Sequence, residues 1–219
     1  MKVLITGSSN GIGKAVAERF LEKGFEVVGL DLLESQIAHP NYQHYVCDIS
    51  KKKSLPNIKD IEIIFNNAGT QNKNDIDNNL IGSINVTEKY AFQPMIKAVL
   101  FNASASAHSG FEFPEYVASK AGVIGYMKNV ATRLAEFGAT ANSISLGGVL
   151  TTSNAPVMED ENSWNKIMEA TPLKKWATLS EVADWVYFLL IINKSASGQD
   201  FLIDNGEYNL NSTFVWPQR

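Results

Sequence analysis

The chain has 219 residues, of which 45% are hydrophobic and 19% are charged, and its formal net charge is -4 at pH 7. This length and composition predict a single globular domain over residues 1–219, and the negative charge disfavours a surface that follows nucleic-acid phosphates. The single cysteine, Cys47, excludes an internal disulfide and a thiolate zinc site, so we expect no metal and a reducing, cytoplasmic location.

The apolar segments of the chain also argue against a membrane partner. Residues 1–5 lead directly into a glycine-rich turn, which leaves no room for an apolar signal segment. The most continuous apolar run, residues 186–192, is far too short to span a bilayer.

The first elements predict a β-α-β unit. A short apolar run at residues 3–5 precedes the glycine-rich segment 6–13, and apolar residues then recur at helical spacing. Gly24 ends this helix, and residues 25–30 form a second buried strand that ends at Asp31. Such a unit places backbone N–H groups and the positive end of a helix against a pyrophosphate, so it predicts a dinucleotide site.

Asp31 bears on which dinucleotide is bound. A carboxylate at the end of the second strand can accept hydrogen bonds from the adenosine ribose hydroxyls, and its charge would repel a 2′-phosphate. Asn10 precedes Gly11, and no Lys or Arg closely follows Asp31, so a phosphate clamp is missing. We therefore predict NAD in preference to NADP. A helix N-cap or a solvated turn is the alternative role for Asp31.

The middle of the chain predicts three further strands, at residues 45–47, 61–65 and 99–101. Residues 51–60 are too few for a full crossover helix. Residues 77–98 predict a helix with Asn79 near its start as a candidate cap, and Pro94 bends or ends it.

The last part of the chain predicts a helix from Tyr116 to Gly138, a strand at residues 141–146, and a seventh strand with its turn within residues 198–206. Ser180 is expected to cap a helix that reaches Ile192. The polar, acidic segment 152–175 lies between these elements, and we interpret it as a mobile lid over the substrate.

Tyr116 and Lys120 are four residues apart, so they share one face of the predicted helix. A phenol titrates near pH ~10, and it can act as an acid or base at neutral pH only where positive charge lowers its pKa. Lys120 is placed to supply that charge. Because a Tyr-x-x-x-Lys pair also arises by chance, its meaning depends on the motifs around it.

Those motifs together resemble a classical short-chain dehydrogenase/reductase. The segments that carry the resemblance occur in the family's order: Thr6-Gly7-x-x-x-Gly11-x-Gly13, Asp48-Ile49, Asn66-Asn67-Ala68-Gly69, Asn79-Leu80-x-Gly82, Tyr116-x-x-x-Lys120, Asn142-x-Ile144-x-x-Gly147, and Gly198-Gln199 ahead of Asp204. The resemblance implies one doubly wound, Rossmann-type α/β domain with a mostly parallel seven-stranded sheet flanked by helices.

The resemblance also implies catalytic roles. Tyr116 would protonate the carbonyl oxygen in reduction, or accept the proton in oxidation, while Lys120 lowers its pKa and holds the nicotinamide ribose. Ser104 would donate a hydrogen bond to the substrate oxygen. Ser106 is the alternative serine, and His108 is interpreted as a loop residue that this chemistry does not require.

A fourth catalytic position and the cofactor site follow from the same resemblance. Asn79 would hold a helix distortion and a water that connect Lys120 to solvent, and it is preferred to Asn85 because Leu80 and Gly82 follow it. The predicted cofactor-binding residues are Gly7, Ser9, Asn10, Gly11, Ile12, Gly13, Asp31, Asp48, Ile49, Asn67, Ala68, Gly69, Tyr116, Lys120, Val149 and Thr151.

The sequence therefore predicts an NAD-dependent oxidoreductase that transfers a hydride between the cofactor and a small-molecule carbonyl or secondary alcohol. A non-enzymatic dinucleotide sensor or scaffold is the alternative. A reductase for carrier-bound acyl groups is disfavoured because residues 159–161 are acidic. We expect a homodimer or homotetramer, although the segment from Gly69 to Asn79 is shorter than usual. Leu146 replaces the usual proline before Gly147, and the tail 209–219 is a candidate contact with a neighbour.

Overall fold

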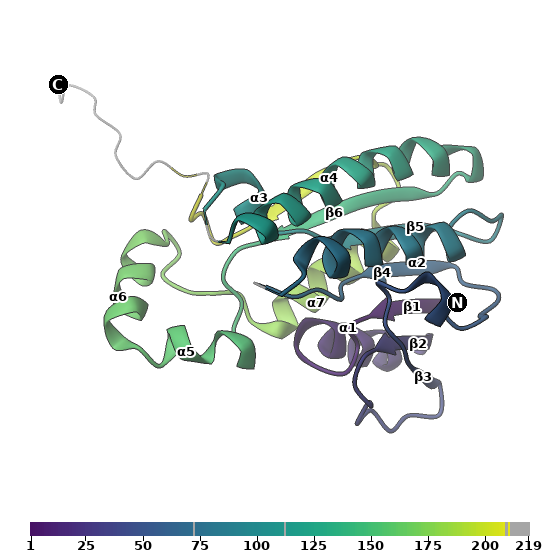
Figure 1. Ribbon diagram of the computed structural model, residues 1–219, viewed down its shortest axis with the longest axis horizontal. Coiled ribbons are helices and arrows are strands. Elements are labelled where there is room, and N and C mark those ends of the chain that lie inside the picture. The colour runs from purple at the N-terminus through teal and green to yellow at the C-terminus, as the bar shows by residue number, and fades with distance from the viewer. Residues whose placement is uncertain (72, 112, 209, 211–219) are drawn as a thin grey trace.

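The protein is seen in a computed structural model that describes residues 1–71, 73–111, 113–208 and 210 (Figure 1). Seven strands form one sheet in the order β3-β2-β1-β4-β5-β6-β7, and every neighbouring pair is parallel. The strands are β1 (Lys2–Thr6), β2 (Glu26–Asp31), β3 (Tyr42–Val46), β4 (Ile63–Asn66), β5 (Ala98–Asn102), β6 (Thr140–Leu146) and β7 (Asp200–Ile203). This confirms the predicted α/β fold with a parallel seven-stranded sheet.

Helices cover both faces of this sheet. The α-helices are α1 (Gly11–Glu22), α2 (Gly82–Tyr90), α3 (Ser106–Ser109), α4 (Pro114–Leu134), α5 (Ala155–Met158), α6 (Glu161–Ala170) and α7 (Leu179–Tyr187). Two π-helical segments, η2 (Ile76–Ile81) and η5 (Phe188–Ile192), adjoin α2 and α7, and three short 3-10 segments are η1 (Lys52–Ser54), η3 (Ala135–Phe137) and η4 (Thr152–Asn154). Figure 1 shows α5 and α6 set apart from the sheet.

The core lies in two layers, one on each face of the sheet. Val3 and Ile5 of β1 pack with residues of α1 and α7, while Leu4 packs with residues of α2 and α4. Strands that are apolar on both faces are typical of a parallel sheet covered by helices on both sides. Strand β1 lies between β2 and β4, so the strand order reverses there, and the carboxyl ends of these strands form the crevice where such sheets bind ligands.

The helix predicted over residues 77–98 has different bounds in the structure. It ends at Tyr90 and begins with the π-helix η2, so Asn79 lies inside a distorted turn and is not a cap. Pro94 explains the early end, because proline lacks an N–H group and disfavours helical backbone before it. The segment 51–60 contains only the short η1, as its length predicts.

The predicted cap at Ser180 is also wrong. Thr178 is the N-cap of α7, because its side chain accepts a hydrogen bond from the Glu181 N–H, and the Glu181 carboxylate accepts one from the Thr178 N–H. This capping box satisfies two N–H groups that Ser180 could not reach. Segment 152–175 holds η4, α5 and α6, and its action as a lid remains a prediction. The predicted contact through the tail falls on residues 209–219, which lie outside the described residues except for Leu210.

In the described ranges, no helix is both long and apolar enough to cross a membrane. The same residues contain no group of three or more His, Cys, Asp or Glu side chains that could hold a metal ion.

Candidate active site

A cavity of about 690 Å³ lies at the carboxyl ends of the central strands. Its lining brings together residues from β2, the glycine turn, the segment after β4, and α4. The lining residues are Gly7, Asn10, Gly11, Ile12, Leu30, Asp31, Leu32, Cys47, Asp48, Ile49, Asn67, Ala68, Gly69, Thr70, Gln71, Lys73, Asn78, Asn102, Tyr116, Lys120, Thr151, Thr152 and Ser153. Most of the predicted cofactor-binding residues therefore lie around one space.

The glycine turn forms one wall of this cavity. Gly7 and Gly11 have φ values of +68° and +51°, which side-chain-bearing residues rarely adopt. A Cβ atom on Gly13 would lie 2.0 Å from the Gly7 carbonyl oxygen, so only glycine allows this close packing of α1 against the turn. Helix α1 starts at Gly11 and has no acidic residue in its first turn. The cavity wall is therefore a free helix N-terminus of the kind that binds a pyrophosphate.

Asp31 lines the cavity at the end of β2, and both of its oxygens are oriented by backbone N–H groups. Its Oδ2 accepts from the Ser9 N–H at 2.9 Å, and its Oδ1 accepts from the Leu33 N–H at 3.0 Å. Because a carboxylate has about four acceptor positions, each oxygen can still accept from a ligand hydroxyl. Ser9 itself is buried, so it acts by holding Asp31 in place.

Asp48 and Ile49 lie at the same end of the cavity, beyond β3. The Asp48 Oδ1 accepts from the Ser50 N–H at 3.0 Å and from the Ser50 hydroxyl at 2.6 Å, and Lys51 forms an ion pair with Asp48 at 2.9 Å. The Ser50 hydroxyl, followed by Lys51, keeps the pKa of the Asp48 carboxyl below its usual value. We call this part of the cavity, with Asp31 and Asp48, the acidic end.

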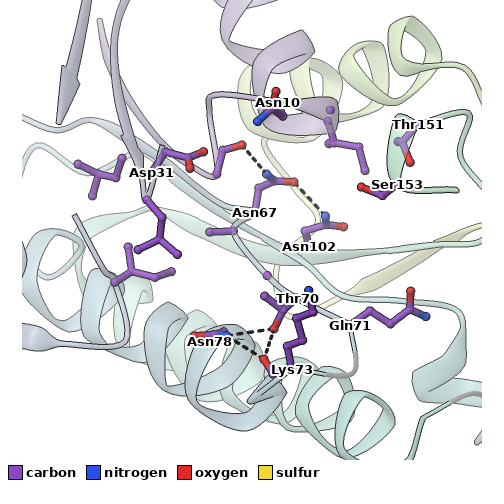
Figure 2. A pocket seen from close by; sticks show the side chains of 18 of the residues that line it. Asn10, Asp31, Asn67, Thr70, Gln71, Lys73, Asn78, Asn102, Thr151 and Ser153 are labelled. Atoms are coloured by element: carbon purple, nitrogen blue, oxygen red, sulfur yellow. Dashed lines mark hydrogen bonds between the residues drawn. The ribbon is translucent and has the colours of Figure 1, made fainter. Parts of the chain in front are cut away.

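Asn67 connects the glycine turn to the centre of the sheet. The Thr6 hydroxyl oxygen accepts from the N–H groups of Asn67 and Ala68, both at 2.9 Å, and the Asn67 side-chain amide donates to the Thr6 carbonyl at 3.0 Å. The Asn102 side-chain amide donates in turn to the Asn67 Oδ1 at 3.0 Å. Figure 2 shows the side chains of Asn67 and Asn102 next to each other in the middle of the cavity.

Tyr116 and Lys120 lie on α4 and line the cavity beside the end of β5, which β1 and β4 separate from the end of β2 with Asp31. The Lys120 ammonium donates to the Asn102 carbonyl at 2.7 Å and lies 5.6 Å from the centroid of the Tyr116 ring. Lys120 is only 5% exposed, and burial lowers its pKa to about 8, with the Asp75 carboxylate opposing that shift. A charge in this position stabilises a tyrosinate. We call the part of the cavity that holds Lys73 and Lys120 the basic end.

Asn79 lies beside this pair, inside the π-helix η2. Its Oδ1 accepts from the Thr70 N–H at 2.7 Å, and its side-chain amide donates to the Thr70 carbonyl at 3.0 Å and to the Ser119 hydroxyl at 2.9 Å. A Cβ atom on Gly69 would lie 2.8 Å from the Asn79 Oδ1 and 3.5 Å from the Lys120 nitrogen. Asn79 and Lys120 therefore converge on Gly69. Asn85 instead donates to the Ile49 and Ser50 carbonyls near the acidic end.

The two candidate serines contact each other directly. The Ser104 oxygen accepts from the Ser106 N–H at 3.2 Å and from the Ser106 hydroxyl at 2.8 Å. This arrangement leaves the Ser104 O–H group to donate a hydrogen bond, whereas the Ser106 proton is already used. His108 lies on α3, where its Nε2 is 2.7 Å from the Asp200 Oδ2 on β7.

The last two predicted residues lie on the segment after β6. Val149 is buried and forms an isolated parallel bridge with Ala177, and the Asn154 amide donates to its carbonyl at 2.8 Å. Thr151 lines the cavity next to Ser153. Val149 therefore supports the wall on which Thr151 lies.

Ten lining residues were not among the predicted site residues: Leu30, Leu32, Cys47, Thr70, Gln71, Lys73, Asn78, Asn102, Thr152 and Ser153. Asn102 ends the buried strand β5, so a polar residue at the carboxyl end of a parallel strand was a signal that could have identified it. Thr70 and Lys73 lie in the segment after Gly69, which is shorter than usual in the family, and no sequence pattern pointed to them.

The fold and the cavity define a dinucleotide-binding α/β protein with a tyrosine and a lysine at one end of the crevice. A family model described as enoyl-(acyl carrier protein) reductase matches residues 7–207. The chain belongs to the short-chain dehydrogenase/reductase family of oxidoreductases. It is 28% identical over 242 residues to the 3-oxoacyl-[acyl-carrier-protein] reductase FabG of Buchnera aphidicola, covering 93% of this chain and 96% of that protein.

Solved structures with low identity share the fold. A 4-hydroxyisoleucine dehydrogenase complexed with NADH has a TM-score of 0.83 and 22% identity, covering 96% of this chain and 99% of that one. A putative 2-deoxy-D-gluconate 3-dehydrogenase from Agrobacterium tumefaciens with bound NADP has a TM-score of 0.84 and 22% identity, covering 94% of this chain and 95% of that one. Both nicotinamide dinucleotides thus occur on this fold.

Proposed function

We propose that the protein reduces a small-molecule carbonyl compound, or oxidises the corresponding secondary alcohol, with a nicotinamide dinucleotide. One observation carries the proposal: the glycine turn with Asp31 and the pair Tyr116 and Lys120 line the same cavity. The cofactor, when bound, supplies or accepts the hydride. The residues of the chain bind it, orient the substrate and move a proton.

Tyr116 is the proposed acid and base. Lys120 is held against the Asn102 carbonyl and near the Tyr116 ring, and its positive charge favours the tyrosinate form. The Tyr116 oxygen gives its proton to the substrate oxygen in reduction and receives it in oxidation. Ser104, whose hydroxyl oxygen already accepts from Ser106, donates a hydrogen bond to the same substrate oxygen as charge develops there.

Asp31 supports our proposal that NAD is preferred to NADP. Its oxygens are held by two N–H groups and face the cavity, where a 2′-phosphate would meet their negative charge. NADP in a neighbour of the same fold weighs against this preference, so the two cofactors need direct titration. A preference for NADPH would contradict the assignment to Asp31.

The assembly and location that we propose are a homodimer or homotetramer in the cytoplasm. Trp185, Phe188 and Ile192 are exposed on α7 and η5, and such apolar side chains favour contact with another subunit. Sedimentation analysis of the purified protein would test this assembly, and a monomer would contradict it.

Replacement of Tyr116 tests the catalytic proposal. Tyr116→Phe removes only the hydroxyl, so we expect turnover to fall by about 10²–10⁴-fold while the NADH dissociation constant stays nearly unchanged. The measurement is NADH oxidation with a panel of carbonyl compounds, including a carrier-bound 3-oxoacyl group, alongside fluorescence titration of NADH. Full activity in the variant would contradict the mechanism. If the wild type binds NADH but reduces no member of the panel, the alternative of a dinucleotide sensor or scaffold is favoured.

A further inference from the structure

Four charged side chains from the described residues line the cavity, and three of them have partners in the protein. Asp31 accepts from two N–H groups, Asp48 pairs with Lys51, and Lys120 donates to the Asn102 carbonyl. The fourth is Lys73. Within the described part of the chain, its ammonium makes no hydrogen bond and no ion pair, although carboxylates lie at the other end of the same cavity.

The backbone of Lys73, by contrast, is held at both polar atoms. Its N–H donates to the Asp75 Oδ1 at 3.1 Å, and its carbonyl accepts from the Thr70 hydroxyl at 2.7 Å and from the Asn78 amide at 3.0 Å. Asp75 is fully buried and also accepts from the Thr70 hydroxyl at 2.8 Å. A buried carboxylate is costly, and here it fixes the turn from which Lys73 projects.

The same turn is connected to the catalytic residues. The Thr70 N–H and carbonyl are bonded to Asn79, which also donates to the Ser119 hydroxyl on α4, next to Lys120. The position of Lys73 is therefore set relative to Tyr116 and Lys120 on that helix. Figure 2 shows Lys73 beside Thr70 and Asn78, with Asp31 on the far side of Asn67.

We propose that the substrate carries an anionic group, a carboxylate or a phosphate, and that Lys73 binds this group while the reacting carbonyl lies at Tyr116. The inference rests on the proposed function and narrows its substrate class. Lys73 supplies an unpaired positive charge on a fixed turn at the basic end of the cavity, which is the arrangement that recognises an anion. The carboxylates of Asp31 and Asp48 would repel the same anion from the acidic end.

Binding of simple anions tests this site directly. Malonate and inorganic phosphate are titrated by calorimetry into protein saturated with NADH, using the wild type, Lys73→Gln, Lys73→Arg and the control Lys128→Gln on the exposed face of α4. We expect one of the two anions to bind to the wild type, and its dissociation constant to rise about tenfold or more in Lys73→Gln, as for the loss of a charge-assisted hydrogen bond. Lys73→Arg should restore the affinity, and Lys128→Gln should not change it.

The kinetics should follow the same pattern. Lys73→Gln should raise KM about tenfold or more for an anionic carbonyl compound such as acetoacetate and leave the values for its neutral analogue acetoacetamide unchanged. A wild type that prefers the neutral member of such pairs overturns the inference. Equal anion affinity in the wild type and Lys73→Gln, or no affinity in either, also overturns it.

The cofactor titration separates this inference from the function on which it rests. If Lys73→Gln weakens NADH binding, Lys73 contacts the cofactor and the inference is wrong while the proposed function stands. If the wild type binds neither NADH nor NADPH, the proposed function fails and the inference fails with it.

Discussion

At the acidic end of the cavity, Asp48 is held by Ser50 and Asp31 by Leu33, each two residues further along the chain, and Asp31 also accepts from the Ser9 N–H of the glycine turn. At the basic end, Lys120 is bonded to β5, and Asn79 is bonded to a serine 40 residues away on α4. The acidic end therefore depends mainly on backbone turns, which suits a ligand that does not vary, the cofactor. The basic end depends on how distant elements pack, so small changes in loop length can alter the substrate without disturbing the cofactor site.

The largest effect is expected at the basic end, from Lys120→Met. Loss of the ammonium removes the charge that favours the tyrosinate, so turnover should fall by about 10²–10⁴-fold. The NADH dissociation constant should rise much less, because the glycine turn and Asp31 are unchanged. The ratio of these two effects is measured by steady-state kinetics and fluorescence titration. Equal losses of turnover and of NADH affinity would show that the two ends of the cavity do not act independently.

The same variant changes how stability depends on pH. Burial lowers the pKa of Lys120 from 10.5 to about 8. Between those values the unfolded chain binds more protons at this site, so the free energy of unfolding gains a term that increases with pH. This term is at most about 1.4 kcal/mol per pH unit, and it should be missing in Lys120→Met. Urea unfolding at pH 8 and pH 10 measures it, and identical slopes for both proteins would contradict the buried ammonium.

The two serines provide the second test. Ser104→Ala should lower kcat by about 10²–10³-fold, the loss that follows removal of one donor to a developing oxyanion. Ser106→Ala removes only a donor to Ser104 and should cost about 1 kcal/mol, or roughly fivefold. Steady-state kinetics on both variants decides between them. A larger loss of kcat in Ser106→Ala than in Ser104→Ala would assign Ser106 as the residue that contacts the substrate.

The third test concerns the glycine turn at the acidic side of the cavity. Gly13→Ala places a Cβ atom 2.0 Å from the Gly7 carbonyl oxygen, so the turn must open at a cost of about 1–3 kcal/mol. NADH affinity should fall by about tenfold to a hundredfold, together with the thermal midpoint. Gly125→Ala on α4 is the matched control, because its Cβ meets no atom within 4 Å and should stabilise the helix slightly. Unchanged NADH affinity in Gly13→Ala would contradict the placement of the pyrophosphate.

The smallest expected effect is on cofactor choice. Asp31→Asn removes the negative charge, so the NADH dissociation constant should rise roughly tenfold while that of NADPH falls. Asp48→Asn is the control at the same end, because Asp48 is already paired with Lys51 and should leave the ratio of the two constants unchanged. Titration of both cofactors measures the ratio. If the ratio of the two dissociation constants changes equally in both variants, the cofactor preference depends on the net charge of this end and not on Asp31 itself.

The same contrast explains how much the sequence predicted. The residues of the acidic end could be predicted from motifs such as Gly7 to Gly13 and Asp31. Their geometry depends on backbone turns, which require particular residues at a fixed spacing in the sequence. The parallel sheet was predicted from the resemblance to the family, whose motifs occur along the chain in the family's order.

Asn102 was not predicted, although its place at the carboxyl end of β5 was a signal for it. Lys73 could not be placed, because its turn is positioned relative to α4 through the bonds of Asn79 to Thr70 and to Ser119. The helix end at Tyr90 comes earlier than predicted because of Pro94.

The position of β1 in the sheet has a consequence for how the chain folds. This strand pairs with β2 on one side and with β4 on the other, and the Thr6 hydroxyl bonds the two N–H groups that follow β4. The pairing of Val3 with Ile63 closes a loop of about sixty residues. The loss of conformational entropy on closing this loop is larger than for strands that are close in sequence. Until β4 arrives, one edge of β1 is an open template for another chain. Assembly of β1 with β4 is therefore the step at which a slow folding phase and aggregation during refolding are expected.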